Sequence, residues 1–318
     1  MDVCLMIEGQ EGVTWEQWLD LALTCESSGF NGLFRSDHYL SFSDPHERGA
    51  LDAWSTLSAL AAVTERIRLG TMVSPVTFRH PAMLAKSVAT ADHVAGGRVE
   101  LGMGAGWFER EHEAFGFSFP SDGERMEILA EQLEIVHRLW GRDENEVTFE
   151  GTHYRLDACV ALPKPLQTPH PPLILGGGAG PRAAALAARW ADEYNVNYID
   201  PDEAAARRRR LSEACEAVDR DPASLRLSLM NGVVVGSDRA EVERRAAALL
   251  AHEGKDEDPA TALERWRAER LVGTVDEVIS RLAEYADAGV ERVMLQHLVH
   301  DDLETVELIG REIVPRVS

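Results

Sequence analysis

The feature of the sequence that most constrains the fold is a regular alternation of short apolar runs with longer amphipathic stretches. The short runs have the length and composition of buried strands, whereas the longer stretches repeat apolar residues at helical spacing. Strand and helix alternate about eight times, a pattern typical of parallel βαβ units. The predicted strands lie at residues 3–7, 32–35, 67–73, 98–103, 173–175, 194–197, 225–235 and 292–295.

This alternation predicts an α/β fold, a (β/α)₈ TIM barrel, as one domain over residues 1–318. Capping boxes of Thr14 with Gln17 and of Thr274 with Glu277 mark two of the helix starts. An open doubly wound sheet is the alternative fold. Its phosphate fingerprint is missing, because the turn after the first predicted strand reads Glu-Gly-Gln-Glu-Gly at residues 8–12 and not G-x-G-x-x-G.

Residues 141–172 interrupt the alternation. The stretch 147–156 has the pattern of a small hairpin, and a proline-rich stretch follows it up to residue 172. We interpret this segment as a hairpin and loop insertion near the C-terminal mouth of the barrel strands. Substrate specificity is expected to reside in this insertion and in the neighbouring loops.

The composition argues against several classes of function. A formal net charge of −22 argues against nucleic acid as a partner, because phosphate binding depends on a basic surface. We interpret the four arginines at residues 207–210 as a solvated helix face, since acidic residues share their helical stretch. No apolar run approaches the ~18 residues of a membrane span, and the first residues lack the basic segment of a signal peptide. We therefore expect a cytoplasmic protein with reduced thiols, no membrane partner and a small-molecule substrate.

A glycine-rich turn follows the fifth predicted strand, at the end where barrels of this kind carry their active sites. Residues 176–180 read Gly-Gly-Gly-Ala-Gly and lead directly into a helix that starts at Pro181. Glycines let backbone N–H groups converge, and the helix N-terminus adds partial positive charge, so the turn favours an anion such as a phosphate. The alternative is a tight turn at a crowded helix, although four glycines in five residues exceed what a turn needs.

The second predicted strand ends with Asp37 and His38, which form the best acid–base candidate. A histidine has its pKa near neutrality, and an adjacent carboxylate can hold or polarise it. The alternative is a histidine that only hydrogen-bonds a loop. We interpret Glu109, Glu111 and Glu113 as mostly solvated, with any one of them able to line the mouth.

Two common catalytic motifs are missing from the sequence. Without an H-E-x-x-H segment, a metal hydrolase is disfavoured, and we expect no metal ligands. Without a G-x-S-x-G segment, acyl transfer by a serine is disfavoured as well.

Several segments together resemble the luciferase-like monooxygenase family. They are Leu-Phe-Arg-Ser-Asp-His-Tyr at 33–39, Arg-His-Pro-Ala-Met-Leu-Ala at 79–85, Gly-Gly-Arg-Val-Glu-Leu-Gly at 96–102, Gly-Ala-Gly-Trp at 104–107 and the glycines at 176–178. Further matches at 190–195 and 272–274 extend the resemblance over nearly the whole chain. The Ser-Asp-His segment is similar to that of the branch that uses the deazaflavin coenzyme F420.

The resemblance implies hydride transfer between F420 and a small organic substrate. It places His38 near the ring carbon that exchanges hydride, as acid or base, and Asp37 at the ring edge or against His38. It also implies a non-proline cis peptide between Met72 and Val73, below the ring. The cofactor phosphate would be held by Gly177, Gly178 and Ala179, with further cofactor contacts from Gly104, Gly106, Trp107 and Gly176.

Trp107 departs from the pattern of the family's glucose-6-phosphate enzymes, which carry a catalytic glutamate just after the same glycines. A sugar-phosphate substrate is therefore not implied. Trp107 instead offers flat apolar area that packs against ring or substrate and excludes water. The family also implies a homodimer, which the sequence by itself does not establish.

Three alternatives stay open at this point. An FMN-dependent monooxygenase that receives reduced flavin from a partner reductase would use the same glycine turn. A cofactor-binding protein without turnover would need neither Asp37 nor His38. A metal-free isomerase or lyase on the same barrel would make the glycine turn and His38 coincidental.

Overall fold

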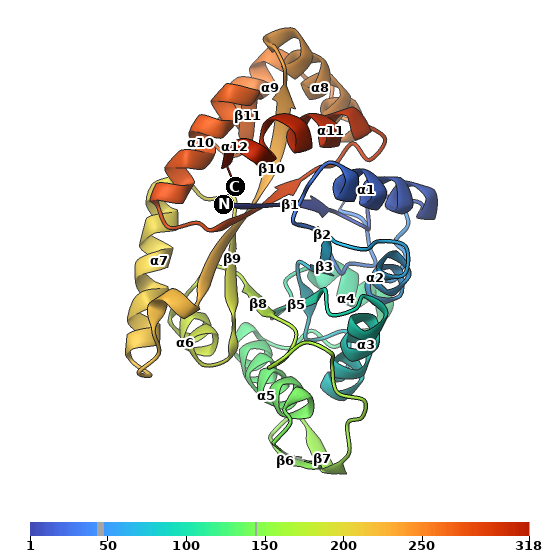
Figure 1. Cartoon of the computed structure of the whole chain (residues 1–318), viewed down its shortest axis with the longest axis vertical. Helices are drawn as coiled ribbons and strands as arrows, with labels where there is room; N and C mark the ends of the chain where they lie inside the picture. Colours follow the sequence, from blue (N-terminus) through green and yellow to red (C-terminus); the bar gives the residue numbers. More distant parts are fainter. Residues whose placement is uncertain (43–47, 144, 318) are drawn as a thin grey trace.

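The computed structural model describes residues 1–42, 48–143 and 145–317, with a closed barrel of parallel strands at its centre (Figure 1). Within these residues, eight strands pair in the order β9–β10–β12–β1–β2–β3–β5–β8, and β8 returns to β9. The parallel pairing of all eight confirms the predicted (β/α)₈ barrel. The strands are β1 (Asp2–Ile7), β2 (Gly32–Arg35), β3 (Arg68–Thr71), β5 (Val99–Gly104), β8 (Leu173–Gly176), β9 (Glu193–Asn197), β10 (Arg226–Gly236) and β12 (Arg292–Gln296).

Two strands differ from the prediction. The stretch predicted as one strand at 67–73 contains only β3, and a short β4 (Ser74–Pro75) follows it and pairs with β5. A further strand, β11 (Leu271–Thr274), pairs with the second half of β10 and lies outside the closed barrel. The apolar pattern did not predict β11, because it is short and half-buried.

Helices surround the barrel on its outside (Figure 1). The predicted capping boxes are present at both sites, where Thr14 and Gln17 begin α1 and Thr274 and Glu277 begin α10. The helices between the barrel strands are α1 (Trp15–Ser27), α2 (Ala53–Ala61), α3 (Pro81–Val94), α4 (Glu109–Phe115), α5 (Asp122–Trp140), α6 (Pro181–Trp190), α7 (Pro201–Glu216) and α10 (Val275–Asp287). The C-terminal pair is α11 (Leu303–Glu312) and α12 (Val314–Val317).

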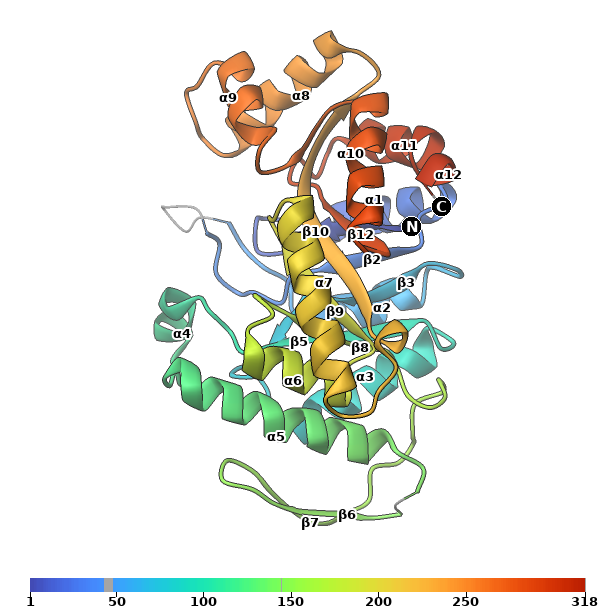
Figure 2. The ribbon, with the colours of Figure 1, turned by 90° about the vertical axis from the view of Figure 1, so that its left-hand side faces the viewer.

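A small second cluster of apolar residues lies beyond the barrel, beside the upper part of β10. There α8 (Arg239–His252) and α9 (Pro259–Trp266) pack together, with Leu249, Leu263 and Trp266 buried between them. Figure 2 shows both helices projecting past the rest of the barrel wall. This corner supplies His252, Glu253 and Lys255 to the rim of the mouth.

The apolar core has two layers, as burial of both faces of a parallel sheet requires. Most buried leucines and valines lie between the strands and the surrounding helices. The inside of the barrel holds a separate set, which consists of Cys4, Met6, Phe34, Met72, Ile174, Met230 and Met294. Each fully buried side chain of this size contributes about 1.5–3 kcal/mol of transfer free energy.

Charged side chains close the N-terminal end of the barrel. Arg292 lies between two buried carboxylates, with Nη1 2.7 Å from Glu100 and 3.1 Å from Glu193. Arg68 also pairs with Glu100. A small molecule therefore reaches the barrel interior from the opposite, C-terminal end.

The insertion at 141–172 contains the predicted hairpin, formed by β6 (Val147–Glu150) and β7 (Arg155–Cys159). Its turn is fixed to α5, because the Glu131 carboxylate accepts the backbone N–H groups of Thr152 (2.6 Å), His153 (3.0 Å) and Tyr154 (3.0 Å). Figure 2 shows the hairpin running along the outer side of α5. The described part of the insertion contributes no residue to the lining of the mouth, so the expected role of this segment in specificity gains no support.

Within the described ranges, none of the helices has both the length and the apolar character that crossing a bilayer takes.

Candidate functional site

A cavity of about 800 Å³ opens at the carboxyl ends of the barrel strands, where active sites of TIM barrels lie. Most of the residues predicted from the sequence line it, although they come from four different strand ends. These are His38, Met72, Val73, Gly104, Gly106, Trp107, Gly176, Gly177 and Gly178. Asp37 and Ala179 are fully buried behind the wall and do not line the cavity.

The side chain of His38 is held by a carboxylate from a different loop. Its Nδ1 lies 2.8 Å from Oε2 of Glu111 on α4, and the Glu111 side chain is fully buried. The other oxygen of Glu111 accepts the backbone N–H groups of Tyr39 and Leu40. The carboxylate thus fixes both the imidazole and the loop that carries it, while Nε2 is left as the ring nitrogen available for chemistry.

The charges of this pair decide the protonation of His38. Burial alone lowers the pKa of His38, but the hydrogen bond and charge of Glu111 outweigh it, and the pKa lies above the ordinary value of 6.5. Burial by itself raises the pKa of Glu111. The hydrogen bond and the charge of His38 have the larger, opposite effect, so the pKa of Glu111 lies below the ordinary value of 4.5. His38 can therefore carry a proton near neutral pH and exchange it with a substrate oxygen.

Aromatic rings surround His38 on the open side of the cavity. The centroids of the Phe42 and Trp107 rings lie 5.1 and 5.8 Å from the imidazole centroid, both in edge-on geometry. Trp107 stacks on Phe108 at 5.3 Å. Trp107 is nonetheless 63% exposed, so this apolar wall has area available for a ligand.

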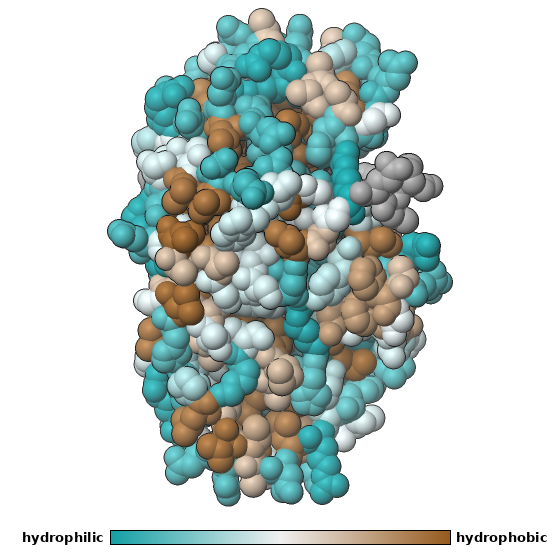
Figure 3. All heavy atoms as spheres, turned by 90° about the vertical axis from the view of Figure 1, so that its right-hand side faces the viewer, coloured by the Kyte–Doolittle hydropathy of each residue, from teal (hydrophilic) through white to brown (hydrophobic). Residues whose placement is uncertain are grey.

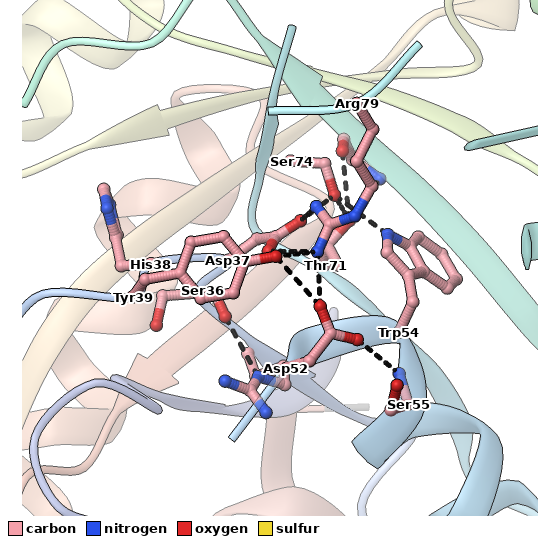
Figure 4. Close-up of polar contacts among 12 residues, drawn as sticks. Ser36, Asp37, His38, Tyr39, Asp52, Trp54, Ser55, Thr71, Ser74 and Arg79 are labelled. Carbon is pink, nitrogen blue, oxygen red and sulfur yellow. Dashed lines mark hydrogen bonds and ion pairs between the residues drawn. The ribbon is translucent and has the colours of Figure 1, made fainter. Parts of the chain in front are cut away.

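Asp37 faces away from His38 and toward Arg79 (Figure 4). Its Oδ2 accepts hydrogen bonds from Arg79 Nη1 (2.5 Å) and from the Ser74 hydroxyl (2.6 Å), and its Oδ1 accepts one from Arg79 Nη2 (3.1 Å). Arg79 also donates to Asp52, 2.7 Å away. The structure thus assigns the orientation of His38 to Glu111 and not to Asp37, whose carboxylate instead ties the end of β2 to the loop before α3.

Val73 forms the floor of the cavity between two glycines. The peptide bond between Met72 and Val73 is cis, as predicted. A Cβ atom on Gly104 would lie 2.7 Å from Val73 Cγ2, and one on Gly176 would lie 3.1 Å from Val73 Cγ1. Glycine at these two positions is therefore what lets the Val73 side chain sit against the backbone of β5 and β8.

The turn after β8 fits the expected phosphate site only in part, because two of the three residues expected to hold the phosphate use their backbone N–H groups elsewhere. Gly177 has φ +145°, which glycine adopts without strain. The N–H groups of Gly177 and Ala179 are used within the protein, by Asn195 O (3.1 Å) and the Tyr194 hydroxyl (2.8 Å). The N-terminal cap of α6, Gly180, offers no side chain to the first-turn N–H groups, which leaves them to a ligand.

Arg207 lies closer to this turn than the sequence indicated. Arg209 and Arg210 are exposed, as predicted for the arginine run. Arg207 instead lies against the glycine turn, because its Nη1 would be 3.1 Å from a Cβ on Gly178. Its Nε pairs with Glu203 at 2.5 Å, which positions the guanidinium. A cation beside a glycine turn is what an anionic cofactor tail requires, so the residues present fit such a group.

Two carboxylates of the site escaped the sequence reasoning. Glu8 directly follows β1, so the strand-end rule could have found it. Its Oε1 accepts from Gln296 Nε2 (2.6 Å) and its Oε2 from Gln10 Nε2 (2.9 Å). Glu111 was predicted only as one of three mostly solvated glutamates, but it is fully buried. Its contact with His38 could not be predicted, because the two residues are 73 positions apart and no pattern linked its helix to the second strand.

Comparison with known proteins places this geometry in context. A family model described as luciferase-like monooxygenase matches residues 3–292. An F420-dependent glucose-6-phosphate dehydrogenase from Microbacterium testaceum (strain StLB037) is 31% identical over 94% of this chain and 92% of its own length.

Two solved structures resemble the chain over its whole length. One is an F420-dependent secondary alcohol dehydrogenase in complex with an F420–acetone adduct, with TM-score 0.84 and 21% identity over 100% of this chain and 99% of that chain. The other is a monooxygenase from Streptomyces bottropensis, with TM-score 0.83 and 24% identity over 100% of both chains. At these identities the two structures establish the shared fold alone.

Proposed function

Since the chain belongs to the luciferase-like monooxygenase family, we propose that it is an F420-dependent oxidoreductase that transfers a hydride between the deazaflavin and a small organic substrate. The observation that carries the proposal is the placement of His38. Its imidazole lines the cavity, is oriented by a buried carboxylate and lies in the same space as the glycine turn. The relatives that are about 30% identical over most of the chain are named as F420-dependent dehydrogenases.

The residues present fit a flat ring with an anionic tail. Val73 and the glycines around it would lie under the ring, and the turn at Gly177 and Gly178, with Arg207 beside it, would hold the phosphate. The bound deazaflavin would supply the ring carbon that gives or takes the hydride. The chain itself would position the substrate, exclude water with Trp107 and Phe108, and move one proton through His38.

A spectroscopic assay tests the proposal directly. Purified protein is mixed with oxidised F420 and a panel of alcohols, or with reduced F420 and a panel of carbonyl compounds and activated alkenes. We expect the absorbance of oxidised F420 to fall in the first case or to rise in the second, with at least one substrate. A protein that binds F420 but exchanges no hydride with any member of either panel would favour a binding protein without turnover.

The second candidate is an FMN-dependent monooxygenase. The matching family model is described as luciferase-like monooxygenase, and a glycine turn of this kind suits the phosphate of either cofactor. With reduced FMN and oxygen, such an enzyme would insert oxygen into its substrate. Oxygen-dependent product formation with FMN, and none with F420, would establish this candidate in place of the first.

For the assembly we propose a homodimer formed through the face of α1, α2 and α3. Figure 3 looks onto this side of the molecule, where apolar patches interrupt the polar surface. The exposed apolar residues on these helices or directly after them include Leu23, Val63, Met83 and Val94. Light scattering of the native protein and of Met83→Asp tests this, with a monomeric native protein as the contradicting result.

A further inference from the structure

We infer that the substrate is an uncharged alcohol with an apolar body, or the corresponding carbonyl compound, and that Glu8 selects against anionic substrates. The inference rests on the proposed F420-linked function and specifies its substrate class. It differs from the sugar phosphate that the name of the 31% identical relative would lead one to try first.

The arginine and the lysine in the described lining of the cavity each have a carboxylate partner already. Arg48 lies 2.8 Å from Glu11, and Lys255 lies 2.6 Å from Glu253. Arg270, next to the rim, pairs with Glu253 as well, at 3.3 Å. An incoming phosphate or carboxylate would have to displace one of these partners to gain a cation.

Glu8 is different, because its partners are neutral. Both of its oxygens accept from amide groups, Gln296 Nε2 at 2.6 Å and Gln10 Nε2 at 2.9 Å, and no lysine or arginine of the described residues forms an ion pair with it. The residue is 7% exposed and lines the cavity. Its negative charge therefore faces the ligand space without an ion pair, although it lies near enough to His38 to help raise the pKa of that imidazole.

A network of hydrogen bonds keeps this carboxylate in place. The Tyr198 hydroxyl donates to Gln296, which donates to Glu8. On the other side, the Ser36 hydroxyl donates a hydrogen bond of 2.6 Å to Gln10 Oε1. The side-chain amide of Gln10 in turn donates a hydrogen bond to Glu8. A carboxylate has about four lone-pair sites, so the two amides leave acceptor capacity for a hydroxyl group of the substrate.

Most of the exposed area of the cavity wall is apolar. Phe42 and Trp107 flank His38 and are 42% and 63% exposed, and Met230 and Leu298 also line the cavity. Exposed rings of this size in a cavity are stabilised when an apolar ligand covers them. A carboxylate without an ion pair, together with a mainly apolar wall, fits a neutral amphiphilic alcohol.

The reaction balances with these groups. In the oxidative direction the carbinol C–H bond breaks, and its electron pair leaves with the hydrogen as hydride for oxidised F420. The hydroxyl proton passes to Nε2 of His38, and the C=O bond forms. The alcohol loses two electrons and the coenzyme gains them, and the reverse sequence reduces the carbonyl compound.

A matched pair of secondary alcohols tests the inference, 4-hydroxycyclohexanecarboxamide and 4-hydroxycyclohexanecarboxylate, which differ in charge and little in shape. For the F420-loaded wild type we expect the carboxamide to bind at least about 10-fold more tightly by calorimetry and to show the higher kcat/KM. In Glu8→Gln the preference should shrink by about 10-fold, because the variant removes the charge and keeps the shape. Glu150→Gln, on the distant hairpin and 70% exposed in its side chain, makes the same change in net charge and should leave the preference unaltered.

Each result has a defined meaning. Tighter binding of the carboxylate by the wild type, no binding of the carboxamide, or an unaltered preference in a folded Glu8→Gln protein would overturn the inference. Circular dichroism and F420 affinity establish that the variant is folded. Failure of the wild type to bind F420 is seen separately in the cofactor titration, and it would refute the proposed function itself.

Discussion

Nδ1 of His38 lies 2.8 Å from Oε2 of Glu111, a carboxylate that is fully buried on a helix 73 residues away in sequence. This contact fixes which ring nitrogen faces the cavity and which protonation state the imidazole prefers. A histidine oriented by a buried acceptor is a common arrangement for a group that transfers protons. The chemistry proposed for the site depends on this pair more than on any other contact.

Replacing His38 tests its role as the proton-transfer group. In His38→Asn we expect turnover to fall by about 10²–10⁴-fold, because the substrate oxygen loses its acid or base. The dissociation constant of F420 should change little. Steady-state rates and a fluorescence titration measure the two quantities, and a variant with full turnover would remove His38 from the mechanism.

Replacing Glu111 tests the pKa of His38. The raised pKa means that His38 becomes a neutral base only above pH 6.5, so the rate of alcohol oxidation should rise with pH through that raised value. In Glu111→Gln the carboxylate that raises the pKa of His38 is gone, and burial lowers that pKa. The increase in the oxidation rate should therefore occur at lower pH than in the wild type. The pH dependence of kcat for the two proteins measures the shift, and superimposable profiles would contradict it.

The pair of His38 and Glu111 makes the free energy of unfolding depend on pH. His38 has a raised pKa, so its contribution is complete below pH 6.5 and is lost as the pH rises through the raised value. Glu111 has a lowered pKa, so its contribution is present above pH 4.5 and is lost as the pH falls through the lowered value. The stability advantage of the wild type over Glu111→Gln should therefore be largest between these limits. Urea titrations at pH 5.5 and pH 9 check this, and an advantage that grows toward pH 9 would contradict it.

Asp37 should matter for stability. In Asp37→Asn, one of the two oxygens that Arg79 pairs with becomes an amide nitrogen and a buried negative charge is lost, so we expect the free energy of unfolding to fall by about 1–3 kcal/mol. The exposed pair of Arg155 and Glu150 offers a control, because Glu150→Gln should have no measurable effect. Denaturant titrations compare the two variants, and an Asp37→Asn protein as stable as the wild type would show that this ion pair is dispensable.

The glycine turn offers a matched pair of substitutions. Gly177 has φ +145°, so Gly177→Val should strain the backbone and weaken F420 binding. Gly180 has φ −65° and open space around a Cβ, so Gly180→Ala should leave affinity close to that of the wild type. Undiminished affinity in a folded Gly177→Val protein would show that the phosphate lies elsewhere.

Much of the fold could be predicted from local pattern, because apolar periodicity and capping residues act within one element. All eight barrel strands were predicted close to their observed positions. The short β11 was not, since it pairs only with the second half of β10 outside the barrel. Three further statements remain predictions: that the chain forms one domain, that it assembles as a dimer and that it is located in the cytoplasm.

The candidate site was predictable where it follows the strand ends and not where it depends on tertiary contacts. His38 and the glycine turn follow strands and were predicted by that rule, whereas Val73 was predicted from the family resemblance. Of the two roles predicted for Asp37, the orientation of His38 belongs to Glu111 instead, because neighbours in sequence at a strand end point to opposite sides. Glu111 reaches His38 through the path of a loop and a short helix, which no spacing in the sequence encodes.

The most direct test of the central claim is a pair of titrations of the pure apo-protein, one with F420 and one with FMN. The geometry and the relatives predict that F420 binds with a dissociation constant at least about 10-fold below that of FMN. Tighter binding of FMN, or no saturable binding of F420, would contradict the account.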